Sequence, residues 1–298
     1  MSVTPGAVTR ASGAPPAAAR ARAWLQAGVL LALATMIYQR SAVALWNTWS
    51  TNDNYSHGPL IPLTSLVLVW LRRDRLRALE VRPDARGLLL VAMGCSMMIL
   101  GVRADLFALQ AWSLLPLLFG LSLAFLGVAF TRMLAFPIGY LGFMLTFPPI
   151  VMNQLSYALK ELAMRVSVKG AEALGVTLQR SGMSLYLATG ELRVENPCSG
   201  LRSLLALLAT GTLFAYFQKG GPWRRAAVLV AAVPIALLAN IARLLVLIVA
   251  AHYRSVAWAT GKFHDVTGYV LYAVALAAMM GLRAALTPRA PAAAKEPA

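Results

Sequence analysis

Several common signals of chemistry are missing from this 298-residue sequence. It has no His-Glu-x-x-His helix, no phosphate-binding glycine loop, no Gly-x-Ser-x-Gly elbow and no residue spacing typical of a metal site. It has only two cysteines, Cys95 and Cys198, and Cys95 lies inside an apolar run. We therefore expect no metal, no cofactor and no disulfide framework, so each thiol needs its own explanation.

Charged residues are also scarce. They make up 13% of the chain, whereas hydrophobic residues make up 59%. This is far too apolar for a soluble domain of this size and predicts an integral membrane protein. The charges present are unbalanced, with 27 Lys and Arg against 11 Asp and Glu. Such an excess fits a nucleic-acid partner, anionic lipid, or the bias of cytoplasmic loops toward basic residues.

Eight segments have the apolar character and approximate length of a membrane span. The expected fold class is an all-α polytopic membrane protein of about eight transmembrane helices. Pro116, in the longest segment, predicts a kinked helix or a helix pair. The segments are residues 24–39, 58–71, 88–102, 106–130, 133–151, 198–217, 226–251 and 266–286.

One membrane domain is expected at residues 24–286, between disordered cytoplasmic tails at 1–23 and 287–298. Its longest outer insertion is about 152–197. There the helical spacing of apolar residues over 153–174 predicts an amphipathic helix on the membrane surface. The alternating residues 183–187 and 191–195 predict a short β-hairpin before the sixth span.

The distribution of arginines predicts the orientation. With the N-terminus inside, 16 of the 27 basic residues but only four of the 11 acidic residues fall in cytoplasmic segments. This satisfies the positive-inside rule. Topology thus accounts for the basic excess, and we expect membrane lipid but no nucleic acid among the partners.

Cys198 stands where the polar outer segment turns into an apolar span. Asn196 is a favoured N-cap and Pro197 suits a first helical position, which places Cys198 in the first helical turn. The helix dipole, and Arg202 one turn later, would stabilise a thiolate, the reactive form of cysteine. The alternatives are a buried structural cysteine, Ser199 as the nucleophile, and an Arg202 that pairs with Glu195 or binds a substrate carboxylate.

Arg243 lies within the seventh span, roughly 12 Å from its outer end at 1.5 Å per residue. A charge at that depth costs several kcal/mol unless it faces a cavity or a partner, so it indicates a functional site. Asn240 lies one turn earlier on a similar face and would share its hydrogen bonds. The alternative is an arginine that snorkels outward or pairs for packing.

Only three histidines are present, His57, His252 and His264, and all fall on the outer side in this topology. Any of them could transfer protons to and from a thiol, and spacing alone does not choose among them. Asp265, next to His264, is expected to cap the eighth span, because adjacent residues of a helix point apart.

Three blocks resemble the exosortase/archaeosortase family of membrane cysteine peptidase-transpeptidases. They are Asn196-Pro197-Cys198-Ser199-Gly200-Leu201-Arg202-Ser203, Asn240-Ile241-Ala242-Arg243 and Phe263-His264-Asp265-Val266-Thr267-Gly268. The segment Asn54 to Pro62 also resembles the family's first outer loop, and the likeness covers about residues 24–286.

The resemblance implies Cys198 as nucleophile, Arg243 as the residue that stabilises the oxyanion, and His264 as general acid/base. His57 carries over as a motif position without a role. The implied partners are exported proteins with a C-terminal sorting signal of the Pro-Glu-Pro type, a membrane helix and a basic tail. The implied location is the bacterial inner membrane, with the active site facing the periplasm.

Two other classes stay open on the residues alone. A polytopic transporter or flippase would use Arg243 and Arg202 to bind an anionic substrate. No inverted repeat is visible, however, and the candidate residues converge on one membrane face. A structural membrane subunit with an incidental cysteine is the other alternative.

Overall fold

The computed structural model is mostly helical and describes residues 17–193 and 200–288. The chain divides into two compact units, Met1–Ala44 and Leu45–Ala298, each described here by itself. The first unit holds most of the long helix α1 (Ala17–Thr51), which begins within the segment expected as a tail. The expected domain limits of 24 and 286 stay predictions.

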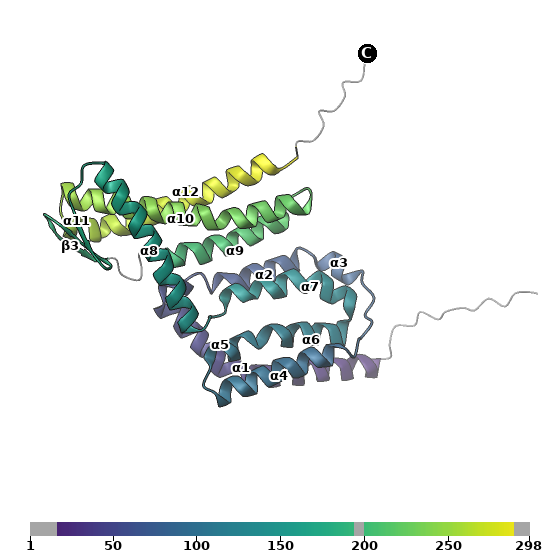
Figure 1. Cartoon of the computed structure of the whole chain (residues 1–298). Coiled ribbons are helices and arrows are strands. Elements are labelled where there is room, and N and C mark those ends of the chain that lie inside the picture. The colour runs from purple at the N-terminus through teal and green to yellow at the C-terminus, as the bar shows by residue number, and fades with distance from the viewer. Residues whose placement is uncertain (1–16, 194–199, 289–298) are drawn as a thin grey trace, which may run out of the picture. The chain divides into compact units, whose positions relative to one another are not determined.

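The second unit begins with the end of α1 and continues through a series of short helices (Figure 1). Glycine allows α4 and α6 to pack closely. A Cβ at Gly87 would lie 2.3 Å from the backbone nitrogen of Ala124, and one at Gly120 would lie 2.6 Å from that of Val91. Small residues at such an interface let helix backbones approach each other. These elements are η1 (Asp53–Tyr55), α2 (Leu60–Trp70), α3 (Arg73–Arg77), α4 (Gly87–Arg103), α5 (Phe107–Trp112), α6 (Leu114–Leu126), α7 (Val128–Tyr140) and η2 (Leu141–Met144).

The interruption expected near Pro116 is present. α5 ends at Trp112 and α6 begins at Leu114, so the break lies just before the proline, which lacks the N–H of a continuous helix. A second break at Gly127, with φ of 89°, separates α6 from α7. The following span therefore starts at Val128, earlier than the expected residue 133.

The chain bends where η2 leads into α8 (Pro149–Ala173), and the two helical runs meet at 77°. Backbone groups outside regular structure need hydrogen-bond partners when they are shielded from water. Aromatic side chains from distant elements supply them at this bend. The Nε1 atoms of Trp49 and Trp112 donate to the carbonyls of Met144 and Thr146, and the backbone N–H of Phe147 donates to the hydroxyl of Tyr55.

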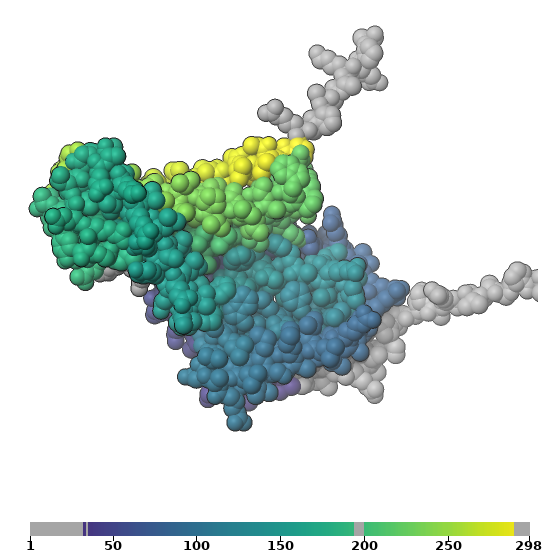
Figure 2. All heavy atoms as spheres, viewed as in Figure 1, coloured from purple at the N-terminus to yellow at the C-terminus, as the bar shows by residue number. Residues whose placement is uncertain are grey.

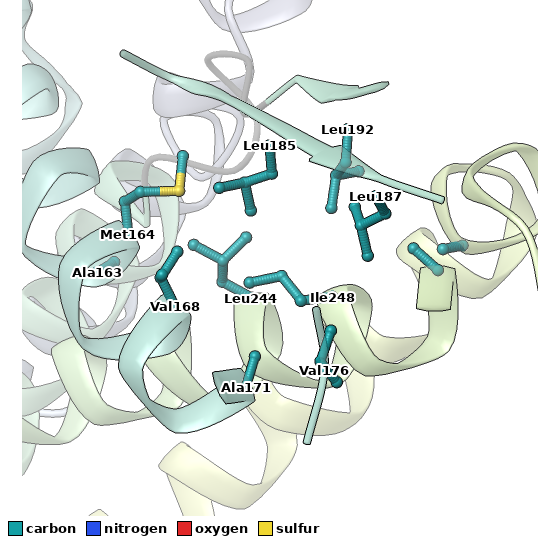
Figure 3. Packing of buried hydrophobic residues seen from close by; sticks show 12 residues of the cluster. Ala163, Met164, Val168, Ala171, Val176, Leu185, Leu187, Leu192, Leu244 and Ile248 are labelled. Atoms are coloured by element: carbon teal, nitrogen blue, oxygen red, sulfur yellow. The ribbon is translucent and has the colours of Figure 1, made fainter. Parts of the chain in front are cut away.

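α8 matches the expected amphipathic helix, and a small antiparallel sheet follows it in the order β1-β2-β3. The predicted hairpin is confirmed in β2 (Ser184–Leu187) and β3 (Gly190–Arg193), where Leu185 pairs with Leu192. The strand β1 (Gln179–Ser181) was not predicted. Figure 3 shows Leu185, Leu187 and Leu192 pointing from the sheet toward α8 and α10 (Pro222–Tyr253), where they form one core cluster.

The apolar stripe predicted for α8 is only partly buried. Ala163 and Val168 are buried, whereas Leu162 and Val166 are exposed. α8 therefore has two apolar faces, one packed on this core cluster and one open to its surroundings.

The remaining helices are α9 (Leu201–Phe217), α10 (Pro222–Tyr253), α11 (Val256–Thr260) and α12 (Lys262–Leu286). α10 packs against both α9 and α12, which run beside it in green and yellow (Figures 1 and 2). Small residues line this packing: Ala232 and Ala236 of α10 and Ala275 of α12 are almost fully buried. Because α10 touches both neighbours, its side chains can join the start of α9 to the start of α12.

Among the residues that the structure describes, three helical stretches are long and apolar enough to cross a membrane: Phe107–Leu126, α10 and α12. The bent pair Val128–Met144 and Pro149–Ala173 would make a fourth if it is one span. α4 and α9 are apolar but shorter. The structure therefore supports several spans, while the count of eight stays a prediction.

Candidate functional site

Arg243 and His264 are in contact across α10 and α12. The Nη2 atom of Arg243 lies 3.1 Å from Nε2 and 3.3 Å from Nδ1 of His264, and 3.4 Å from the His264 carbonyl oxygen. The His264 side chain is only 15% exposed. A guanidinium charge this close to both ring nitrogens opposes a second proton on the ring, so the contact favours the neutral imidazole that a general base requires.

A glycine makes room for this pair. Gly268 lies one turn after His264 on α12, and a Cβ there would be 3.0 Å from Nη2 and 3.1 Å from Cζ of Arg243. Such contacts are tighter than ordinary van der Waals distances, so any side chain at this position would press on the guanidinium. The last glycine of the third resemblance block is therefore explained by the arginine in the second block.

Asn240 faces the opposite neighbour of α10. Its side chain is 5% exposed and lies against the α-carbon of Gly200, where a Cβ would be 2.5 Å from Cγ of Asn240. Gly200 has φ of 73° and immediately precedes α9. α10 therefore carries, one turn apart, a residue that touches the start of α9 and a residue that touches the start of α12.

The start of α9 corrects one expectation. The helix begins at Leu201, after a left-handed Gly200, and Asn196 is not its N-cap. Cys198 precedes Leu201 by three positions in the sequence and lies outside the described residues, so its placement in a first helical turn, and the dipole argument based on it, stay predictions. Glu195, Cys198 and Ser199 themselves lie outside the described residues, so their predicted roles stay predictions.

Arg202 is the second residue of α9 and pairs with Asp53 of η1, with Nη1 and Oδ1 3.6 Å apart. The two side chains are 49% and 63% exposed, so solvent screens the pair and it contributes little to stability. The pair nevertheless places η1 beside the start of α9.

His57 is tied to the bend before α8. Its Nε2 lies 3.2 Å from the carbonyl oxygen of Phe143 and therefore carries the hydrogen of that bond. Nδ1 is buried and has no hydrogen-bond partner in the described parts of the chain. Burial lowers the pKa of His57 below 6.5; the bond to Phe143 opposes this shift and the nearby charge of Arg202 adds to it. His57 holds the backbone of this bend, which explains a motif position that had no assigned role.

The third histidine, His252, lies away from the Arg243–His264 pair. His252 lies nine residues beyond Arg243 on α10, about 14 Å along the helix axis, and its ring packs edge-on against Tyr253. Asp265 does not cap α12 as expected, because the N-cap position is Gly261 and has no side-chain cap. The Oδ1 atom of Asp265 is instead 3.5 Å from Nδ1 of His264, at the limit of a hydrogen bond.

The arrangement can supply acid/base and anion-stabilising chemistry, since it brings together an imidazole, a guanidinium and a carboxamide. Within residues 17–193 and 200–288, no three His, Cys, Asp or Glu side chains form a group that could hold a metal ion. Sequence reasoning missed Asp53, and it did not assign roles to Gly200 and Gly268. Both glycines stand inside the resemblance blocks, and a glycine in or next to a helix is itself a signal of close approach.

The chain was compared with known proteins. It matches no curated protein and no solved structure. A family model described as transmembrane exosortase matches residues 49–281. The match includes all three resemblance blocks and every site residue named above. This protein is therefore a multi-pass membrane protein that belongs to the transmembrane exosortase family.

Proposed function

We propose that this protein is an intramembrane thiol protease/transpeptidase that cleaves C-terminal sorting signals of the Pro-Glu-Pro type from exported proteins. Membership of the exosortase family implies an enzyme that processes sorting signals. The observation that carries the finer proposal is the contact of Arg243 with His264, two residues from separate blocks held together by α10 and α12.

Cys198 is the proposed nucleophile. It lies two residues before Gly200, and two residues of extended chain span at most about 7 Å. Gly200 in turn lies against Asn240, one turn from Arg243. Chain connectivity therefore supports a thiol near the Arg243–His264 pair, and Arg202 is a proposed supporting residue.

The proposed reaction is acyl transfer. His264 takes the proton of the Cys198 thiol, the thiolate attacks a backbone carbonyl carbon of the signal, a C–S bond forms, and the carbonyl π electrons move to the oxygen. Arg243 stabilises that negative oxygen. When the C–N bond breaks, His264 protonates the leaving amine, which departs with the membrane helix and basic tail. His264 then takes a proton from the nucleophile that resolves the thioester.

The proposed location is the bacterial inner membrane, with this site at the outer face and both termini inside. About eight spans are proposed, with α8 as a surface helix whose exposed Leu155, Leu162 and Val166 face lipid. The cluster of Arg72, Arg73, Arg75 and Arg77 between two spans supports this orientation.

Co-expression with a reporter that carries the tripartite tail tests the proposal. The wild-type chain is expected to remove the tail, and Cys198→Ala is expected to abolish removal and leave the reporter full-length. Tail removal by Cys198→Ala at the wild-type rate would exclude a thiol enzyme. Transport of an anionic substrate that needs Arg243 but not Cys198 would favour the transporter alternative.

A further inference from the structure

Asn240 is a buried polar side chain that the proposed roles leave unused. It lies in the middle of the long helix α10, and its Nδ2 atom is buried without a hydrogen-bond partner in the described parts of the chain. Burying an amide without a partner costs free energy, and native proteins keep such groups rarely. A buried amide donor without a partner therefore indicates a hydrogen bond that forms only when a ligand binds.

The position of Asn240 shows where that bond would form. Its carboxamide lies against Gly200, so close that a Cβ at Gly200 would be 2.6 Å from Nδ2. Gly200 precedes α9, a helix of 17 residues. The first turn of a helix presents backbone N–H groups and a partial positive charge. A neutral donor and a helix N-terminus therefore meet at one point, a combination suited to negatively charged oxygen.

Arg243 follows Asn240 by three residues, which places it about one turn later on an adjacent part of the α10 surface. Its Nη2 atom is held against the ring and the carbonyl oxygen of His264, and Gly268 packs on its Cζ. The guanidinium is therefore engaged on the α12 side, while Asn240 presents its amide on the α9 side. Arg243 therefore contacts α12, and Asn240 contacts the start of α9.

We propose that Asn240 is a catalytic residue whose Nδ2 donates a hydrogen bond to the substrate carbonyl oxygen as that oxygen becomes negative. This inference rests on the proposed function and adds a second donor to Arg243. In the step concerned, the Cys198 sulfur bonds to the carbonyl carbon and the carbonyl π electrons move to the oxygen. Nδ2, which has no partner among the described residues, then gains one, so the stabilisation appears mainly in the transition state.

The test compares Asn240→Asp and Asn240→Ala with the wild-type full-length chain in detergent. The first replacement is nearly isosteric but has no amide donor, and the second removes the group. Three quantities are measured: the rate of tail removal from a purified reporter, inhibition by a peptide aldehyde with the signal sequence, and alkylation of Cys198 by iodoacetamide. The aldehyde forms a tetrahedral adduct with the thiol, whereas alkylation develops no negative oxygen.

Removing one oxyanion donor typically costs about 10²–10³ in kcat. We expect a fall of this size in kcat, a weakening of aldehyde inhibition by a similar factor, little change in KM, and an alkylation rate within about threefold of wild type. Wild-type kcat in both variants would overturn the inference. So would an alkylation rate that falls as much as kcat, because that result means a distorted thiol site.

Ser167→Ala is the matched control. Ser167 is fully buried on α8 and its Oγ donates to the carbonyl of Ile241, next to Asn240, so this variant loosens the same turn of α10 without removing the amide. We expect it to lower thermal stability and to leave the ratio of kcat to alkylation rate unchanged. A drop in that ratio equal to the Asn240 effect would overturn the inference.

Failure of the proposed function is recognised by a separate experiment on the wild-type chain. Tail removal that survives full alkylation of Cys198 would show that the thiol is not the nucleophile.

Discussion

The Nη2 atom of Arg243 lies close to both ring nitrogens of His264, 3.1 Å from Nε2 and 3.3 Å from Nδ1. A guanidinium so close to both nitrogens opposes protonation of the ring, because an imidazolium has a hydrogen on each of them. Arg243 therefore acts directly on His264, the proposed proton-transfer residue, whether or not it also binds the substrate oxygen. This coupling predicts that the two residues will not behave independently on mutation.

Arg243→Lys is expected to lower kcat for tail removal by at least about tenfold. Lysine keeps the charge but has no planar fork of donors that could bond the ring and a second acceptor together. The double variant Arg243→Lys/His264→Ala should be little worse than His264→Ala alone. A mutant cycle of tail-removal rates measures this, and strict additivity of the two effects would contradict the coupling.

Gly268→Ala tests the space beside the guanidinium. The added methyl group would lie 3.0 Å from Nη2 of Arg243, so the arginine has to shift and kcat should fall. Gly281→Ala is the control on the same helix, since a Cβ there meets no atom within 4 Å. Replacing an unconstrained helical glycine by alanine stabilises a helix by about 1 kcal/mol, so Gly281→Ala should keep full activity and melt slightly higher. Equal behaviour of the two variants would show that residue 268 does not constrain the site.

The sequence predicted the β-hairpin better than it predicted where helices begin, because the hairpin follows from alternation in 183–195. The roles of Asn240, Arg243 and His264 stay predictions, and the structure adds that the last two are in contact. The start of α9 was misplaced because Asn196-Pro197 is a sound local start signal, whereas Gly200 adopts a left-handed conformation. Local propensity cannot report that Asn240, forty residues later, presses on this glycine.

The limits of the apolar spans were also predicted only in part from the sequence. Pro116 correctly predicted an interruption, but the break after Leu126 depends on Gly127 and on tertiary packing, since a Cβ at Gly127 would overlap the carbonyl of Arg82. The strand β1 is only three residues long and carries Arg180, whose side chain pairs with Glu161 of α8. Such a strand depends on its partners, and its own sequence has too few alternating residues to predict it.

The stability of the chain in detergent should fall in mild acid because of His57. Burial holds the pKa of His57 below 6.5 in the folded protein, so below about pH 6.5 the unfolded chain binds a proton that the folded chain does not. The stabilisation is therefore complete above pH 6.5 and is lost as the pH falls from there through the folded pKa. His57→Gln keeps a donor for the Phe143 carbonyl but does not titrate, so its melting temperature should fall less between pH 7.5 and pH 5. Parallel melting curves for both proteins would show that another group is responsible.

The choice of general acid/base can be tested with two histidines on the same side of the molecule. His264→Ala should reduce tail removal by about 10²–10⁴-fold, the usual contribution of a positioned acid/base group. His252→Ala should retain most activity, because His252 lies about 14 Å along α10 from Arg243 and packs on Tyr253 instead. Added imidazole should partly restore His264→Ala, since the missing group is a proton carrier and the cavity left by the ring can admit it. Reporter cleavage rates at matched protein levels decide the matter. Loss of activity in His252→Ala with a fully active His264→Ala would move the acid/base role to the end of α10 and leave the Arg243–His264 contact a packing interaction.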